Sequence, residues 1–73
     1  MANITELTIL NSADKSYRHA VASGKGAIAE AADPIVTDLE QYPVGSQYTD
    51  LTNKKFYVRV AGDGVVADWV RLN

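Results

Sequence analysis

The chain has 73 residues, a formal net charge of −2, no cysteine and one histidine, His19. This length suits one small domain, which buries only roughly 60% of the surface that its unfolded chain exposes. The lack of cysteine excludes disulfides, iron–sulfur clusters and thiolate zinc sites. The negative net charge disfavours nucleic-acid binding, because no excess of basic residues is present to neutralise phosphates.

Small folds usually add a disulfide, a metal or oligomerisation as a stabilising feature. We expect no metal site and no cofactor, so binding to copies of itself or to a larger partner remains. No apolar run approaches the roughly 20 residues of a membrane span, so we expect no membrane partner. Residues 1–10 lack the basic start and long apolar core of a signal peptide, which indicates a protein made in the cytoplasm.

The first half of the chain predicts two strands. Residues 3–10 (NITELTIL) are rich in Thr and Ile, which favour strands. Residues 11–15 predict a turn, and residues 16–23 predict a returning strand with Tyr17, His19 and Val21 on one face. A helix over residues 16–23 is the alternative, but the short preceding loop favours a hairpin.

The middle of the chain predicts connections. Residues 24–26 (GKG) predict a turn or a joint between two halves, and they lack the GxxxxGK[ST] pattern of a phosphate loop. Residues 27–32 (AIAEAA) predict one helical turn or an irregular connection that Asp33-Pro34 ends. Residues 35–39 predict a short extended segment.

The last third predicts a three-stranded antiparallel meander. Its strands are expected at 47–51, 56–61 and 65–72, with turns at 52–55 and 62–64. In the middle strand, Tyr57 and Arg59 alternate with Phe56, Val58 and Val60. The fold class is therefore mainly β. We expect one small domain with an antiparallel sheet, sandwich or barrel-like arrangement and at most one short helix. Within it, residues 1–42 are expected to form an attachment and intersubunit segment, and residues 43–73 the meander.

Residues 43–72 also follow a distinctive order. A Pro-x-Gly-Ser start precedes an aromatic-x-Asp strand, a Thr-Asn-Lys turn, an aromatic strand, a glycine turn and a tryptophan strand. This order is carried by Pro43, Gly45, Ser46, Tyr48, Asp50, Thr52, Asn53, Lys54, Lys55, Tyr57, Gly62 and Trp69. The stretch resembles a β module of tailed-bacteriophage virion proteins, which occurs in head fibres, capsid decoration proteins and tail fibres.

Some of these positions have a clear physical role. Asp50 is placed to accept backbone N–H groups from the turn at residues 52–54, as Asp does in Asx-turns. Tyr57 and Trp69 lie on adjacent predicted strands, where they could pack as a cross-strand pair. None of these positions indicates a catalytic residue. The chain also offers no set of nucleophile, base and metal ligands, so an enzyme is not expected.

The resemblance implies a structural protein of a bacteriophage virion. We expect a capsid decoration (cement) protein or a head-fibre base on the capsid surface, with the major capsid protein or another virion protein as partner. Surplus apolar residues in the first half indicate intersubunit contacts, and a homotrimer would bury them. The candidate contact residues are Ile4, Leu7, Ile9, Val21, Ile35 and Val36.

Two alternatives predict different observations. A receptor- or glycan-binding module of a tail fibre predicts an exposed aromatic platform that includes Trp69. A small host-directed inhibitor made early in infection predicts that the protein is absent from virions. A metal or acid–base site around His19, Asp14 and Glu30 is less expected than a histidine that simply forms hydrogen bonds.

Overall fold

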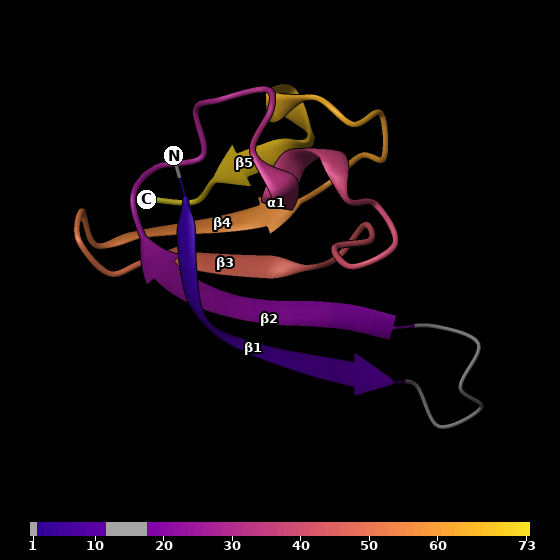
Figure 1. Cartoon of the computed structure of the whole chain (residues 1–73), viewed down its shortest axis with the longest axis horizontal. Coiled ribbons are helices and arrows are strands. Elements are labelled where there is room, and N and C mark those ends of the chain that lie inside the picture. Colours follow the sequence, from indigo (N-terminus) through magenta and orange to yellow (C-terminus); the bar gives the residue numbers. More distant parts are fainter. Residues whose placement is uncertain (1, 12–17) are drawn as a thin grey trace.

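The computed structural model describes residues 2–11 and 18–73. Within these residues the chain forms one five-stranded sheet in the order β1-β2-β3-β4-β5 (Figure 1). The strands are β1 (Asn3–Asn11), β2 (Arg18–Lys25), β3 (Gln47–Asp50), β4 (Lys55–Arg59) and β5 (Trp69–Arg71). The prediction of a small, mainly β fold with a C-terminal three-stranded meander is confirmed.

One strand pair differs from an all-antiparallel sheet. β2 and β3 are parallel, with Ala22 opposite Tyr48 and Gly24 opposite Asp50. Parallel neighbours need a crossover connection, and residues 26–46 supply it. Because β2 and β3 pair, the N-terminal strands and the meander belong to one sheet. Within the GKG segment, Gly24 lies inside β2, and only Gly26, with a φ of 102°, departs from the strand.

β1 and β2 form the expected antiparallel pair, with a bulge between Ile4 and Glu6. A Cβ atom at Gly24 would fall on the backbone of Asn3, so this glycine permits the close approach of β1. The turn predicted at residues 11–15 and the position of Tyr17 lie largely outside the described residues.

The helical turn lies later in the chain than the sequence predicts. Residues 27–32 form an irregular connection, and the helix α1 covers Pro34–Thr37, where an extended segment was expected. Asp33 caps this helix because its Oδ1 accepts the Ile35 backbone N–H at 3.3 Å, and Pro34 fits the first helical position. Asp33-Pro34 therefore begins a helix and does not end one.

The last predicted strand is also shorter than expected. The chain leaves β4, loops through residues 60–65 and forms a 3-10 turn, η1 (Val66–Asp68), before β5. The cause is Asp68, whose carboxylate accepts the backbone N–H groups of Asp63, Gly64 and Val65 and so curls this segment. The strand predicted at 65–72 is confirmed only for Trp69–Arg71.

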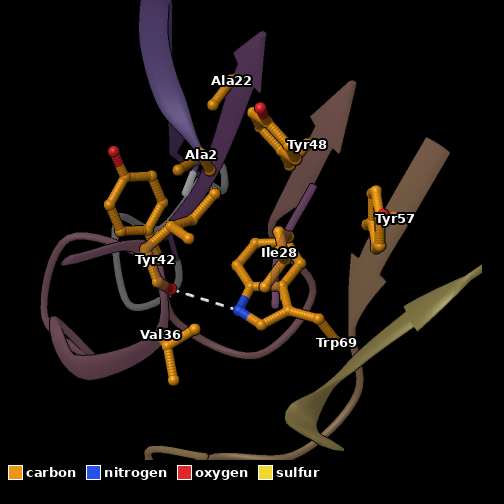
Figure 2. Close-up of a cluster of buried hydrophobic side chains, with 10 residues drawn as sticks. Ala2, Ala22, Ile28, Val36, Tyr42, Tyr48, Tyr57 and Trp69 are labelled. Atoms are coloured by element: carbon orange, nitrogen blue, oxygen red, sulfur yellow. Dashed lines mark hydrogen bonds between the residues drawn. The ribbon is translucent and has the colours of Figure 1, made fainter. Parts of the chain in front are cut away.

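The core lies between the sheet and the crossover (Figure 2). Its apolar members are Ala2, Ala20, Ala22, Ile28, Ile35, Val36, Tyr42, Tyr48, Tyr57 and Trp69. Asp33 ties the chain start to this core, because its Oδ2 accepts the Ala2 backbone N–H at 2.6 Å. We call the side of the sheet that faces this core the inner face.

Candidate interface on the outer face of the sheet

The inner face is organised by a buried arginine. Arg59 is completely buried, and its guanidinium forms five hydrogen bonds. The acceptors are the carbonyl oxygens of Ile35, Val36, Tyr42 and Ala61 and the carboxylate of Asp68. A guanidinium has five N–H donors, so all of its donor capacity is used. Arg59 therefore fastens the crossover and the loop after β4 to the sheet.

Asp68 is the anionic partner of Arg59 at 2.7 Å. Burial acts to raise the pKa of Asp68, but the hydrogen bonds from Arg59, Gly64, Val65 and Asp63 outweigh it and lower the pKa below its usual range. The carboxylate is thus held ionised by groups of the chain itself. These bonds make Asp68 part of the scaffold.

Asp50 performs the turn role that the sequence predicts. Its Oδ1 accepts the backbone N–H groups of Thr52, Asn53 and Gly26, and its Oδ2 accepts the Asn53 side-chain amide at 2.7 Å. Burial acts to raise the pKa of Asp50, but these hydrogen bonds lower it. The turn between β3 and β4 and the end of β2 are therefore joined through one carboxylate.

The aromatic side chains point into the core (Figure 2). Trp69 is 6% exposed, and its Nε1–H donates to the Ile35 carbonyl oxygen at 3.1 Å. Tyr48 donates its hydroxyl hydrogen to the Gly26 carbonyl oxygen at 2.7 Å, and burial is the main cause that raises its pKa to about 12. Tyr42 and Tyr57 are buried as well. These four side chains do not form an exposed aromatic platform.

The predicted cross-strand pair has different members. Tyr57 lies opposite Tyr48 and Arg71, while Trp69 lies opposite Arg59. The Tyr48 and Tyr57 rings pack with centroids 5.9 Å apart, and the Trp69 ring contacts Tyr42 edge-on at 6.5 Å. The Arg59 guanidinium carbon lies 5.6 Å from the Trp69 ring centroid, which adds a cation–π contact.

The opposite side of the sheet, which we call the outer face, has a different composition. Side chains alternate between the two faces along a strand, and the strand register aligns the outward ones in rows. One row is Val21, Gln47, Val58 and Val70, and the next is Ser23, Thr49, Phe56 and Leu72. None of these eight side chains is charged, although 22% of the chain is charged. Charged residues border the two rows, since Glu6 of β1 lies opposite Ser23 and Lys25 ends β2.

Apolar side chains on this face remain accessible. Val70 is 41% exposed and Leu72 is 57% exposed, while Val21, Phe56 and Val58 are half-buried. Sheets with one solvated face normally place polar and charged side chains there. Covering apolar and hydrogen-bonded neutral polar groups costs less hydration free energy than covering charged groups. The outer face is therefore the best candidate interface among the described residues.

The predicted contact residues do not gather in one place. Ile4 and Ile9 are half-buried and pack against the core from β1, Leu7 is 37% exposed, and Val21 lies on the outer face. Ile35 and Val36 are completely buried in the chain's own core, so this fold leaves them no surface for a partner.

The sequence reasoning missed Phe56, Val58, Val70 and Leu72 as surface candidates. The available signal was the alternation in residues 56–61, where one face of the strand contains an arginine and the other is purely apolar. Normally the apolar set would be inside. Here the buried ion pair reverses the assignment, since Tyr57 and Arg59 face the core.

Among the described residues, no group of three or more His, Asp or Glu side chains is placed to hold a metal ion, and no pocket is found. None of the described helices has the length and apolar character needed to cross a membrane. Comparison with family models, curated proteins and solved structures gives no match for this chain.

Proposed function

We propose that this protein is a structural component of a bacteriophage virion: a capsid decoration or head-fibre-base protein that forms a trimer and binds the capsid shell. The resemblance of residues 43–72 to virion β modules supports the virion. The two uncharged rows on β2 to β5 of the outer face support the trimer, and they are the observation that carries the proposal.

An uncharged face suits packing around a symmetry axis. Near a threefold axis each side chain meets its own copies, so a charged residue there would bring three like charges together. An interface with a different protein can instead retain charges, because the partner can present the opposite sign. The absence of charge from the two rows therefore favours further copies of this chain as the occupants of this part of the outer face.

The size of the chain fits such an arrangement. A standard stable interface buries about 800 Å² on each partner, and the whole chain exposes 4409 Å². An interface of standard size would therefore cover a large part of one sheet face. Sheets that pack face to face lie about 10 Å apart, with side chains of the size of Val, Thr and Phe filling the space between them.

In the proposed function the trimer acts mechanically. A protein that binds the assembled shell, and not its separated subunits, shifts the equilibrium toward the assembled shell. This work needs a rigid body and binding surfaces. The buried Arg59–Asp68 pair and the Asp50 turn supply the rigid body.

Light scattering on the purified protein tests the trimer. We expect a mass of three chains or a multiple of three at micromolar concentration. Val70→Asp adds a charge to the outer face and is expected to reduce the assembly to species without the threefold contact. Leu39→Asp is the matched control because Leu39 is 39% exposed but lies in the crossover connection. A wild-type protein that is a folded monomer would refute the trimer.

Two further measurements test the virion role. The protein should co-sediment with shells that lack it, and Val70→Asp should weaken this binding if the trimer is the binding form. Mass spectrometry of purified virions should find hundreds of copies for a shell protein. A handful of copies would instead indicate a tail or fibre component, and absence from virions would contradict the proposal.

A further inference from the structure

The two edges of the sheet are not alike. β5 has only three residues and contains the exposed Arg71, two features that discourage pairing with another strand. β1 has nine residues and contains neither Pro, Lys nor Arg, and among the strands formed by residues 2–11 and 18–73 it has only β2 as a neighbour. An edge strand of this kind presents unpaired N–H and C=O groups to any strand placed beside it.

The part of β1 that is open to pairing is well defined. The bulge between Ile4 and Glu6 interrupts the first part of the strand, so regular geometry extends from Glu6 toward the strand end. This part runs beside β2 at the side of the molecule, away from the crossover (Figure 1). Leu7 is 37% exposed and Leu10 is 49% exposed along it.

We infer that β1 pairs with β1 of a second copy of this chain, antiparallel and centred on Thr8. In this register Thr8 lies opposite Thr8 of the partner subunit, and Leu7 lies opposite Ile9 of the partner subunit. Leu–Ile and Thr–Thr neighbours on antiparallel strands are favourable cross-strand pairs. The pairing covers the exposed Leu7 and continues the sheet into the second copy.

The charge pattern of β1 suits a second copy. Glu6 is the only charged side chain between Asn3 and Leu10. With Thr8 at the centre, Glu6 lies opposite Leu10 of the partner subunit, so the two Glu6 carboxylates do not face each other. Like charges directly opposite would oppose pairing, and this register avoids them without a partner of opposite charge.

This contact is separate from the trimer contact. Strand addition at the edge extends the sheet in its own plane, so the outer face stays open. The inference therefore does not rest on the proposed function. Where both contacts form, trimers are linked in pairs and the expected mass is a multiple of six chains. Edge pairing alone gives a dimer.

Single cysteines test the register in the full chain, whose sequence contains no other cysteine. Directly opposed residues of antiparallel strands have Cα atoms about 4.5–5.5 Å apart, within the range of a disulfide. Under mild oxidation we expect Thr8→Cys to give a covalent dimer. Glu6→Cys and Leu10→Cys should not cross-link alone, but a mixture of the two variants should cross-link.

Light scattering separates this contact from the outer-face contact. Leu7→Lys should abolish the twofold contact and leave any trimer intact, while Leu39→Lys, with similar exposure outside β1, should change neither. A wild-type mass of one or three chains, together with no disulfide from Thr8→Cys, would overturn the inference. A mass of two or six chains that Leu7→Lys does not alter would overturn it as well.

Discussion

The Arg59 guanidinium and the Asp68 carboxylate lie 2.7 Å apart on the inner face of the sheet, with both side chains buried. A buried charge pair is stable only when the remaining donors and acceptors are also satisfied. Here the other Arg59 donors bind four carbonyl oxygens, and Asp68 accepts three backbone N–H groups. The pair therefore holds together parts of the chain that the sheet itself does not connect.

We expect Arg59→Leu to reduce the free energy of unfolding by about 3–5 kcal/mol, because it leaves a buried carboxylate and four carbonyl oxygens without their donor. Urea unfolding followed by Trp69 fluorescence measures the change. Arg71→Leu is the matched control, since Arg71 is exposed in β5 and its replacement should cost no more than about 0.5 kcal/mol. Equal effects of the two substitutions would contradict the role of Arg59.

The two buried aspartates should make the fold sensitive to acid. The pKa values of Asp50 and Asp68 are lowered in the folded chain, because their hydrogen bonds outweigh the effect of burial. The unfolded chain then binds protons at higher pH than the folded chain does. The stability from these groups is present above the ordinary Asp pKa and is lost as the pH falls below about 4.

Urea titrations between pH 2 and pH 7 check this expectation. The unfolding midpoint of the wild type should fall steeply in the acid range, and Asp68→Asn should show a shallower fall from a lower starting value. Asp63→Asn replaces an exposed carboxylate in the neighbouring loop and serves as the control. If the midpoint of Asp68→Asn falls with decreasing pH as steeply as that of the wild type, Asp68 does not contribute to the acid sensitivity.

Tyr48 should make the fold sensitive to alkali. Its pKa is raised to about 12, mainly by burial, whereas an unfolded tyrosine ionises near pH 10. Between these values the unfolded chain releases a proton that the folded chain keeps, so stability falls as the pH rises above about 10. Urea unfolding followed by circular dichroism should show an unfolding midpoint that falls more steeply with pH above about 10 for the wild type than for Tyr48→Phe.

Tyr48→Phe also removes the hydrogen bond to Gly26, and we expect a cost of about 1 kcal/mol at neutral pH. The alkaline comparison is therefore made on the change in unfolding midpoint with pH and not on its absolute value. If the midpoint of Tyr48→Phe declines with rising pH as steeply as that of the wild type, the ionisation of Tyr48 is not the cause of the alkaline loss of stability.

Gly24→Ala should disturb the pairing of β1 with β2. The added Cβ atom would fall on the backbone of Asn3, so β1 has to move, with an expected cost of about 1–3 kcal/mol. Gly62→Ala is the control, because a Cβ atom there meets the Val44 side chain at an ordinary 3.6 Å. Thermal unfolding of both variants compares them, and equal midpoints would refute the close approach at Gly24.

The sequence predicts those parts of the fold that depend on local pattern. β3, β4 and the turn between them follow from alternation and from Asp50, whose partners within the turn, Thr52 and Asn53, lie two and three residues away. β5 was predicted too long because Asp68 binds Arg59, nine residues earlier, and curls the chain before it. A local pattern cannot show that a carboxylate has such a partner.

The candidate interface could be predicted only in part. Val21 was identified, but alternation alone does not say which side of a strand is inside, and the buried Arg59 reverses the usual assignment in β4. The short apolar segment 35–39 predicts an extended conformation for Ile35 and Val36, and Asp33-Pro34 predicts the end of a helix. In the structure the same pair begins a helix that directs both side chains into the core.

The parallel pairing of β2 with β3 also has a consequence for how the chain reaches its native state. The β3–β4 hairpin needs only neighbouring residues, but Ala22 and Tyr48 can pair only after a long loop has closed. Closing such a loop costs entropy before the contacts compensate for it, which slows folding. We therefore expect the meander to order first and the N-terminal strands to add last, so that their edge is exposed longest during synthesis.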